Sequence, residues 1–124
     1  MNPSLKSVLK LENKELLKLN KMKAKKMTLR DLNELIEFSE NEPNQIHTQT
    51  YKMLNQEWNK SKKFSLVDLF IVELTDDEEM EEIILTVQPD EWEQALELGL
   101  EHFESVENYE MCAKVKKLIE TISL

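Results

Sequence analysis

Glycine, cysteine, arginine and long apolar runs are all scarce in this sequence. Its 124 residues include one glycine, three prolines and one cysteine, and its one arginine is Arg30. A lone cysteine excludes an internal disulfide and favours a reducing compartment. With so little glycine and proline, the chain has few residues for the tight turns of a many-stranded sheet. No apolar run approaches the roughly 18 residues of a membrane-spanning helix, so we expect no membrane span.

The first residues carry no pattern typical of a secretory signal peptide. Their apolar residues alternate with lysines, and no small-residue cleavage site follows. Together with the lone cysteine, this predicts a cytoplasmic protein. The bias toward Lys, Asn, Glu and Ile is typical of an AT-rich bacterial or phage genome.

The net charge of −9 is divided unevenly along the chain. Residues 1–30 hold nine of the sixteen Lys and Arg residues but two of the 25 acids. We therefore expect a basic amphipathic N-terminal helix or arm over residues 1–27 and an acidic helical domain over residues 28–124. Several lysines share one side of the helix, which is expected over residues 4–26. They include Lys10, Lys14, Lys18, Lys21 and Lys25.

Hydrophobic periodicity predicts an all-α fold, a small bundle of five or six helices that ends in an antiparallel helical hairpin over residues 89–122. Two earlier helices are expected over residues 29–40, where Thr28 begins a capping box, and over residues 44–60. The first should turn Leu29, Leu32, Leu35 and Ile36 inward. The second should bury Ile46, Thr50, Met53, Leu54 and Trp58.

Residues 66–74 fit either a helix or a strand, although their β-branched and aromatic residues favour a strand. As a strand they would open a short β-hairpin, which stays an alternative across residues 66–87. We favour a helix over residues 76–86. Thr75 with Glu78 resembles a capping box, and the acids that follow suit the first turn of a helix.

The hairpin over residues 89–122 shows two apolar stripes at helical spacing. The first stripe holds Trp92, Ala95, Leu96, Gly99, Leu100, Phe103 and Val106. The second holds Met111, Cys112, Val115, Leu118, Ile119 and Ile122. Two such stripes a few residues apart are expected to be buried against each other or against a third element.

No pattern in the sequence indicates catalysis, a cofactor or a metal. A single glycine cannot build a phosphate-binding loop, and Gly99 is better explained by close helix packing. Cys112 lies on an apolar stripe, which favours a core thiol over a nucleophile. His47 and His102 have no partners at metal-ligand spacing, so we expect both in or beside the core. We therefore predict a protein that is not an enzyme.

Four glutamates follow the polar side of the first hairpin helix. They are Glu93, Glu97, Glu101 and Glu104. Like charges four residues apart each destabilise a helix by about 0.2–0.5 kcal/mol, unless water or nearby cations screen them. The lysines of the basic arm repeat at the same spacing. Our hypothesis is that the two ladders face one another, within one chain or across two.

Residues 92–122 partly resemble the UVR motif. The match lies in Tyr109-Glu110-Met111-Cys112-Ala113-Lys114-Val115-Lys116, followed by Ile119, with Glu107-Asn108 at the polar turn. The UVR motif is a short helical hairpin of bacterial excision-repair subunits, ClpC-type chaperones and the McsA adaptor. The resemblance implies a non-catalytic hairpin that docks other proteins, often a second such hairpin. It assigns packing positions to Tyr109, Ala113, Val115 and Ile119, and rim positions to Lys114 and Lys116.

These features favour a small interaction module, an adaptor or assembly factor of a bacterium or phage, with a protein partner bound through the hairpin and the acidic surface. A homo-oligomer stays open. One alternative is a nucleic-acid-associated protein that binds phosphates through the lysine helix, although scarce arginine and an acidic body oppose this. A second alternative is an acidic mimic of nucleic acid.

Overall fold

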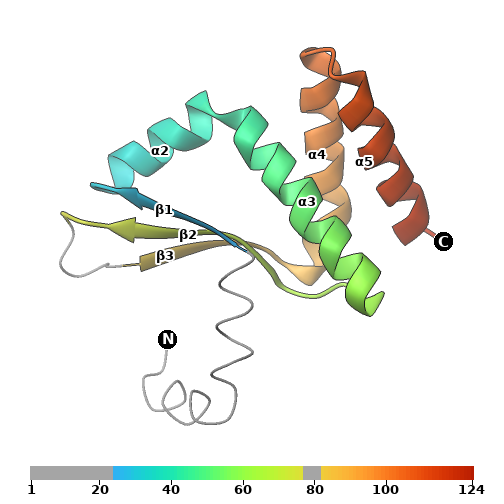
Figure 1. The fold of residues 1–124 in the computed structure, drawn as a ribbon, viewed down its shortest axis with the longest axis horizontal. Helices are drawn as coiled ribbons and strands as arrows, with labels where there is room; N and C mark the ends of the chain where they lie inside the picture. The colour runs from blue at the N-terminus through green and yellow to red at the C-terminus, as the bar shows by residue number, and fades with distance from the viewer. Residues whose placement is uncertain (1–23, 77–81) are drawn as a thin grey trace, which may run out of the picture.

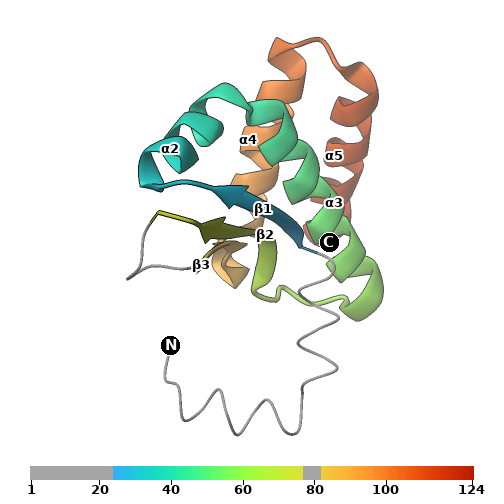
Figure 2. The ribbon, with the colours of Figure 1, turned by 60° about the vertical axis from the view of Figure 1, so that its left-hand side comes forward.

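The computed structural model describes residues 24–76 and 82–124, which form a mixed three-stranded sheet and four α-helices. In chain order the elements are β1 (Lys25–Leu29), α2 (Leu32–Asn41), α3 (Pro43–Ser61), β2 (Val67–Leu74), β3 (Glu82–Val87), the short 3-10 helix η1 (Pro89–Glu91), α4 (Trp92–Ser105) and α5 (Tyr109–Ile122). Figure 1 shows α2 and α3 above the sheet and the α4–α5 hairpin beside α3. The turned view in Figure 2 shows the same arrangement.

The strand order is β1-β2-β3, so β2 lies at the centre. β1 is parallel to β2, with Met27 opposite Val72, while β2 and β3 form an antiparallel pair. Parallel neighbours need a crossover connection, and here the helices α2 and α3 supply it. The sheet therefore needs few tight turns, which is how a chain so poor in glycine and proline builds one.

The all-α expectation is wrong, because strands occupy three segments. Residues 82–86, expected in a helix, belong to β3, and the β-hairpin alternative across residues 66–87 describes the β2–β3 pairing. Lys25 and Lys26, expected at the end of the lysine helix, lie in β1. β2 is buried over most of its length, and its β-branched and aromatic residues suit that environment better than a helix. β1 also spans the expected boundary between residues 27 and 28.

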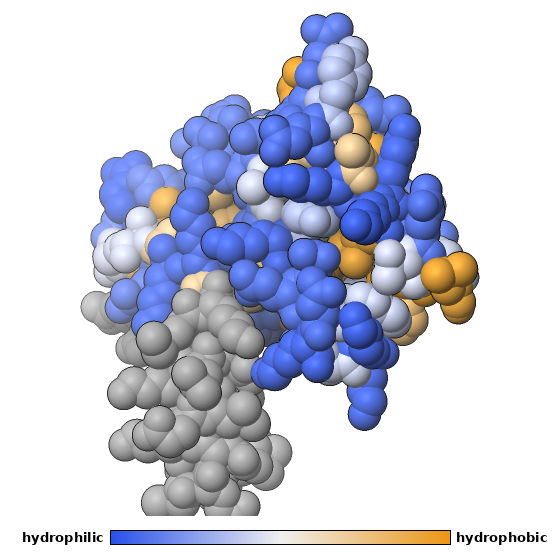
Figure 3. All heavy atoms as spheres, turned by 45° about the vertical axis from the view of Figure 1, so that its right-hand side comes forward, coloured by the Kyte–Doolittle hydropathy of each residue, from blue (hydrophilic) through white to orange (hydrophobic). Residues whose placement is uncertain are grey.

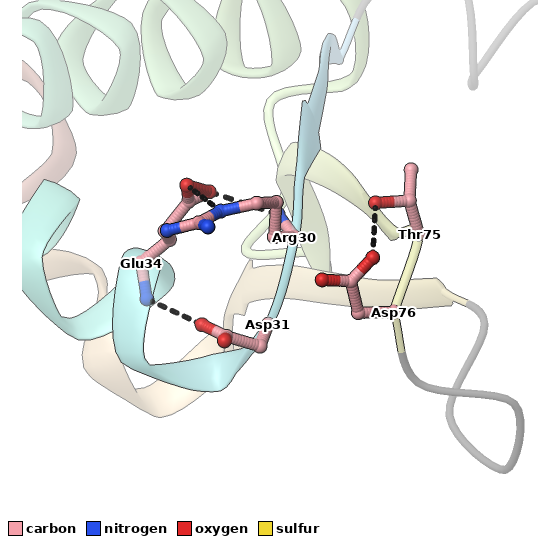
Figure 4. Close-up of polar contacts among 5 residues, drawn as sticks. All are labelled: Arg30, Asp31, Glu34, Thr75 and Asp76. Atoms are coloured by element: carbon pink, nitrogen blue, oxygen red, sulfur yellow. Dashed lines mark hydrogen bonds and ion pairs between the residues drawn. The ribbon is translucent and has the colours of Figure 1, made fainter.

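The turn from β1 into α2 is fixed by polar contacts (Figure 4). The N-cap is Asp31, three residues after the expected Thr28, and its carboxylate accepts from the Glu34 backbone N–H at 3.0 Å. Glu34 accepts from both the backbone N–H and the Nε of Arg30, at 2.8 and 2.7 Å. These contacts lower the pKa of Glu34, the backbone hydrogen bond most of all. The one arginine of the chain therefore serves a local structural role.

The residues of α2 that face the core also differ in part from those expected. Leu32 and Ile36 are 44% and 54% exposed, so their expected inward positions are wrong. Leu29 and Leu35 pack against the core as expected. Phe38 does so too, and it meets Phe70 of β2 edge to face at 5.7 Å. α3 extends one residue beyond its expected range at each end, and it buries Thr50, Met53 and Leu54 as expected.

The core lies between the helices and one face of the sheet. Its largest fully buried side chains are Trp92, Phe70, Phe103, Leu54, Leu96, Val72 and Val115. Phe70, Val72 and Leu74 belong to this core, whereas Ile71 and Glu73 alternate with them and point to the other face of the sheet. None of the described elements packs on that second face, which we call the open face, although Ile71 on it is only 4% exposed.

A buried glutamine joins α3 to an irregularity in β2. Asp68 pairs with Thr86 and Phe70 with Leu85, so Leu69 is the extra residue of a β-bulge. A bulged residue loses its ladder partner, and the side-chain amide of Gln49 donates to the Leu69 carbonyl at 3.0 Å. The backbone group left over by the bulge is thereby satisfied inside the core.

The helical hairpin is confirmed, and every buried residue of α4 and α5 belongs to one of the two expected stripes. Val106, which the first stripe also included, is exposed. Its turn is a Schellman motif: the Asn108 N–H donates to the Phe103 carbonyl at 2.9 Å, and Glu107 has a φ of 58°. The Asn108 side chain then accepts from the Met111 N–H at 3.2 Å and begins α5. The base of the hairpin is also fixed, because Trp92 Nε1 donates to the Ser65 carbonyl at 2.8 Å.

Replacing Gln49 by leucine tests the bulge contact. We expect Gln49→Leu to lower the free energy of unfolding by about 1–3 kcal/mol, because the buried Leu69 carbonyl loses its donor. Urea denaturation followed by circular dichroism measures the change. Gln56→Leu, at an exposed position of the same helix, is the matched control and should change little. Equal effects of the two substitutions would contradict this role of Gln49.

Replacing Glu107 by glycine tests the hairpin turn. Glutamate is strained at positive φ and glycine is not, so Glu107→Gly should raise the free energy of unfolding by roughly 0.5–1 kcal/mol. Glu120→Gly, within α5, should lower it by about as much. Thermal unfolding measures both, and a loss of stability in Glu107→Gly would argue against the turn geometry.

Candidate protein-interaction surface

The acidic ladder lies on the outward side of α4. Glu93, Glu97, Glu101 and Glu104 are all exposed. None of these carboxylates forms a hydrogen bond or ion pair with another residue of the described ranges 24–76 and 82–124. Their mutual repulsion is therefore relieved by water alone within this part of the chain, and the ladder is free to contact a cationic partner.

One of the five lysines named for the basic arm lies within the described residues. Lys10, Lys14, Lys18 and Lys21 lie outside the described residues. Lys25 lies in β1, where its Nζ donates to the Gln45 side chain of α3 at 3.1 Å. The expected contact between the lysine ladder and the glutamate ladder stays a prediction.

A groove runs between the end of β3 and the start of α4. It has a volume of about 290 Å³ and is lined by Thr86, Val87, Glu91, Gln94, Ala95 and Leu98. Leu98 is 51% exposed, and Glu101 is its neighbour one turn further along the helix. The groove therefore joins an apolar centre to the acidic ladder. The sequence stripes missed it, and the one signal was a leucine among glutamates on the polar side of α4.

The connection at η1 holds the two walls of this groove together. The backbone N–H of Gln88 donates to Glu91 Oε1 at 2.9 Å, and the Glu91 N–H donates to the Gln88 carbonyl at 3.0 Å. Pro89, at the first helical position, fixes the backbone further. Because β3 leads into α4 through four constrained residues, the groove is formed without any partner.

The positions implied by the UVR resemblance divide into two groups. Val115 is buried and Ile119 packs against the core. Tyr109 is 68% exposed, and Ala113 is exposed too. Lys114 approaches Glu110 at 3.3 Å along α5 and Lys116 is exposed. The first group helps to close the hairpin on itself, whereas Tyr109 and Ala113 face outward.

The two histidines meet where α3 crosses α4. Their rings stack at 5.0 Å between centroids, and His102 lies 3.4 Å from the Asn44 side-chain oxygen. Partial burial, followed by the nearby His102, lowers the pKa of His47. Gly99 lies opposite His47, but a Cβ there would lie 3.6 Å from His47 Nδ1, an ordinary contact. The packing of α3 against α4 therefore does not require glycine at this position, contrary to our expectation.

The other reactive groups of the described residues do not assemble into a site. Cys112 is a buried free thiol, as expected for a core residue. No group of three or more potential metal-ligating side chains occurs among residues 24–76 and 82–124. A second hollow of about 360 Å³ lies by the open face and is lined by Lys26, Met27, Thr28, Ile71, Glu73 and Glu82. Glu73 and Glu82 stand directly opposite each other in the β2–β3 register.

The surface is mostly hydrophilic on the side shown in Figure 3, where apolar residues form small separate patches. Comparison with protein-family models, with curated proteins and with solved structures gives no match. Within residues 24–76 and 82–124, none of the helices has the length and apolar character to cross a membrane. We take the groove beside Leu98 as the candidate site because it adjoins the exposed glutamates of α4.

The histidine pair predicts a pH dependence. A lowered pKa means that folded His47 binds fewer protons than unfolded His47, whose pKa is about 6.5, so stability falls as the pH drops below that value. We expect the loss between about pH 7.5 and 5.5 to be smaller in His47→Gln, because that variant lacks the titrating group. Urea denaturation of the unchanged chain and of the variant at both pH values measures this loss of stability. An unchanged loss in the variant would contradict the assignment to His47.

Proposed function

We propose that this protein is a non-enzymatic interaction module, an adaptor or assembly factor, that docks a protein segment in the groove between β3 and α4. The observation that carries the proposal is the half-exposed Leu98, which stands in a preformed groove beside four exposed carboxylates of α4. An apolar centre with a charged rim is the usual composition of a protein–protein contact.

The two parts of this surface contribute differently to binding. Covering the exposed half of the Leu98 side chain adds of the order of 1 kcal/mol, and the remaining groove walls add further apolar area. Each exposed ion pair with the ladder contributes only about 0.2–1 kcal/mol. The glutamates therefore attract and orient a basic segment, while the groove retains it.

The outward position of Tyr109 and Ala113 supports a further contact along the hairpin. In the UVR family, which residues 92–122 resemble, such hairpins bind other proteins. A partner seated in the groove could extend along the ladder toward the α4–α5 turn, where Val106 and Tyr109 are exposed. The hairpin would then contribute both an apolar end and an acidic side to one interface.

Site-specific cross-linking tests the proposal. A photoreactive amino acid in place of Leu98 should yield a discrete protein adduct in extract of the cells that naturally produce the protein. The same amino acid at Ile36 is the control, since that side chain is equally exposed on α2. A Leu98 probe that yields no adduct, or the same adducts as Ile36, would overturn the proposal.

Charge reversal then tests the ladder. Glu97→Lys with Glu101→Lys should slow association with the captured partner, and each lost pair should weaken binding roughly 1.5- to 5-fold. Glu37→Lys with Glu40→Lys changes the net charge equally on the exposed side of α2 and should have little effect. Surface plasmon resonance at low and high salt separates this effect from changes in the groove. Equal effects of the two double variants would show that net charge alone matters.

A further inference from the structure

We propose that the partner segment binds as an extended strand, hydrogen-bonded to the outer edge of β3, and that it alternates apolar and basic residues. The inference rests on the proposed function, because it specifies how a segment would occupy the groove beside Leu98.

The outer edge of β3 offers a template for such a strand. β3 is an outer strand of the sheet, and its residues Glu-Ile-Ile-Leu-Thr-Val are strongly β-prone. Every second residue of an edge strand turns its backbone N–H and C=O away from the sheet. Protected edges commonly contain lysine, proline or a bulge, and β3 contains neither lysine nor proline, while the bulge of the sheet lies in β2. The groove opens at the end of this strand.

The two faces of β3 set the residue pattern of the added strand. Ile83, Leu85 and Val87 point to the helix side, where Leu98 is half exposed. Apolar residues of the partner would therefore lie on that side. On the open face, Ile84 is 40% exposed, and Glu82 is exposed opposite Glu73. A lysine or arginine of the partner there would cover Ile84 with its aliphatic stem and bring its charge to the two carboxylates.

Electrostatics favours a basic segment over a second copy of this chain. Antiparallel pairing of two β3 strands would add a second Glu73–Glu82 pair to the same continuous open face and bring two acidic α4 ladders closer together. Repulsion between like charges on neighbouring strands, and between the two copies, opposes this pairing of β3 strands. A basic segment reduces the same repulsion. Since β3 has six residues, the matching segment spans about 20 Å.

A designed peptide serves as the probe. Fluorescein-labelled acetyl-Val-Lys-Val-Lys-Val-Lys-Val-amide has the proposed alternation, and fluorescence anisotropy measures its binding to the full chain. We expect binding to weaken about tenfold or more when alternate backbone amides are N-methylated, because that removes the donors to β3. A peptide with the same composition in two blocks should also bind more weakly, since it cannot place all valines on one face. The alternating Val-Glu peptide should not bind.

Variants of the protein assign the binding position. Leu98→Asp should weaken binding about tenfold, and Glu82→Lys roughly threefold. Ile36→Asp and Glu37→Lys are the controls, matched in exposure and charge change on α2, and should bind as the unchanged chain does. Circular dichroism checks that all four variants stay folded. Hydrogen exchange should also show new protection of backbone amides in Ile83–Val87 when the Val-Lys peptide is bound.

The outcomes separate this inference from the proposed function. No binding of the alternating peptide up to about 1 mM, or equal binding of its N-methylated form, would overturn strand addition. So would binding without protection of the β3 amides. A Leu98 cross-link to a natural partner would still support the proposed function in each of these cases. Absence of that cross-link, with peptide protection of β3 intact, would instead reject the proposed function while leaving the edge competent to pair.

Discussion

The burial of β2 is the constraint on which the other elements depend. Phe70 and Val72 are fully buried on the helix side, and the backbone pairs with β1 on one edge and β3 on the other. α3 is held to this strand by Gln49 at the bulge, and α4 crosses α3 where His47 meets His102. The position of the hairpin, and so of the groove, is therefore set by α3, by the Trp92–Ser65 hydrogen bond before β2 and by the η1 connection from β3.

The helical half of the fold could be predicted from the sequence because its signals are local. The apolar stripes of α4 and α5 recur at helical spacing, and the burial of Trp92, Phe103 and Val115 follows them. The strands could not be predicted with the same reliability. β1 is five residues long, and it is stabilised by a parallel partner more than 40 residues later in the chain. No periodicity within residues 25–29 indicates that partner, and the neighbouring lysine pattern suggested a helix.

One part of the candidate site could be predicted from the sequence and the other could not. The glutamate ladder was visible in the sequence, because four-residue spacing on a polar helix face places the side chains in solvent. Whether it binds a partner stays a prediction. The groove was not visible, because one wall comes from β3 and the other from α4, and the β3 wall was assigned to a helix. A leucine on the polar side of a helix, such as Leu98, was the only trace that the sequence offered.

The acidic surface also bears on the risk that the edge strand β3 pairs with another copy of the chain. An exposed six-residue strand of mostly aliphatic and β-branched residues is a general hazard, because it can pair with the same strand of another copy. β3 contains no lysine or proline that would prevent this, but glutamates lie at its start, opposite it on β2 and along α4. These glutamates repel the same glutamates of a second copy, whereas they attract a basic segment. The same charges that destabilise α4 slightly thus oppose pairing of this edge between two copies and favour a basic segment there.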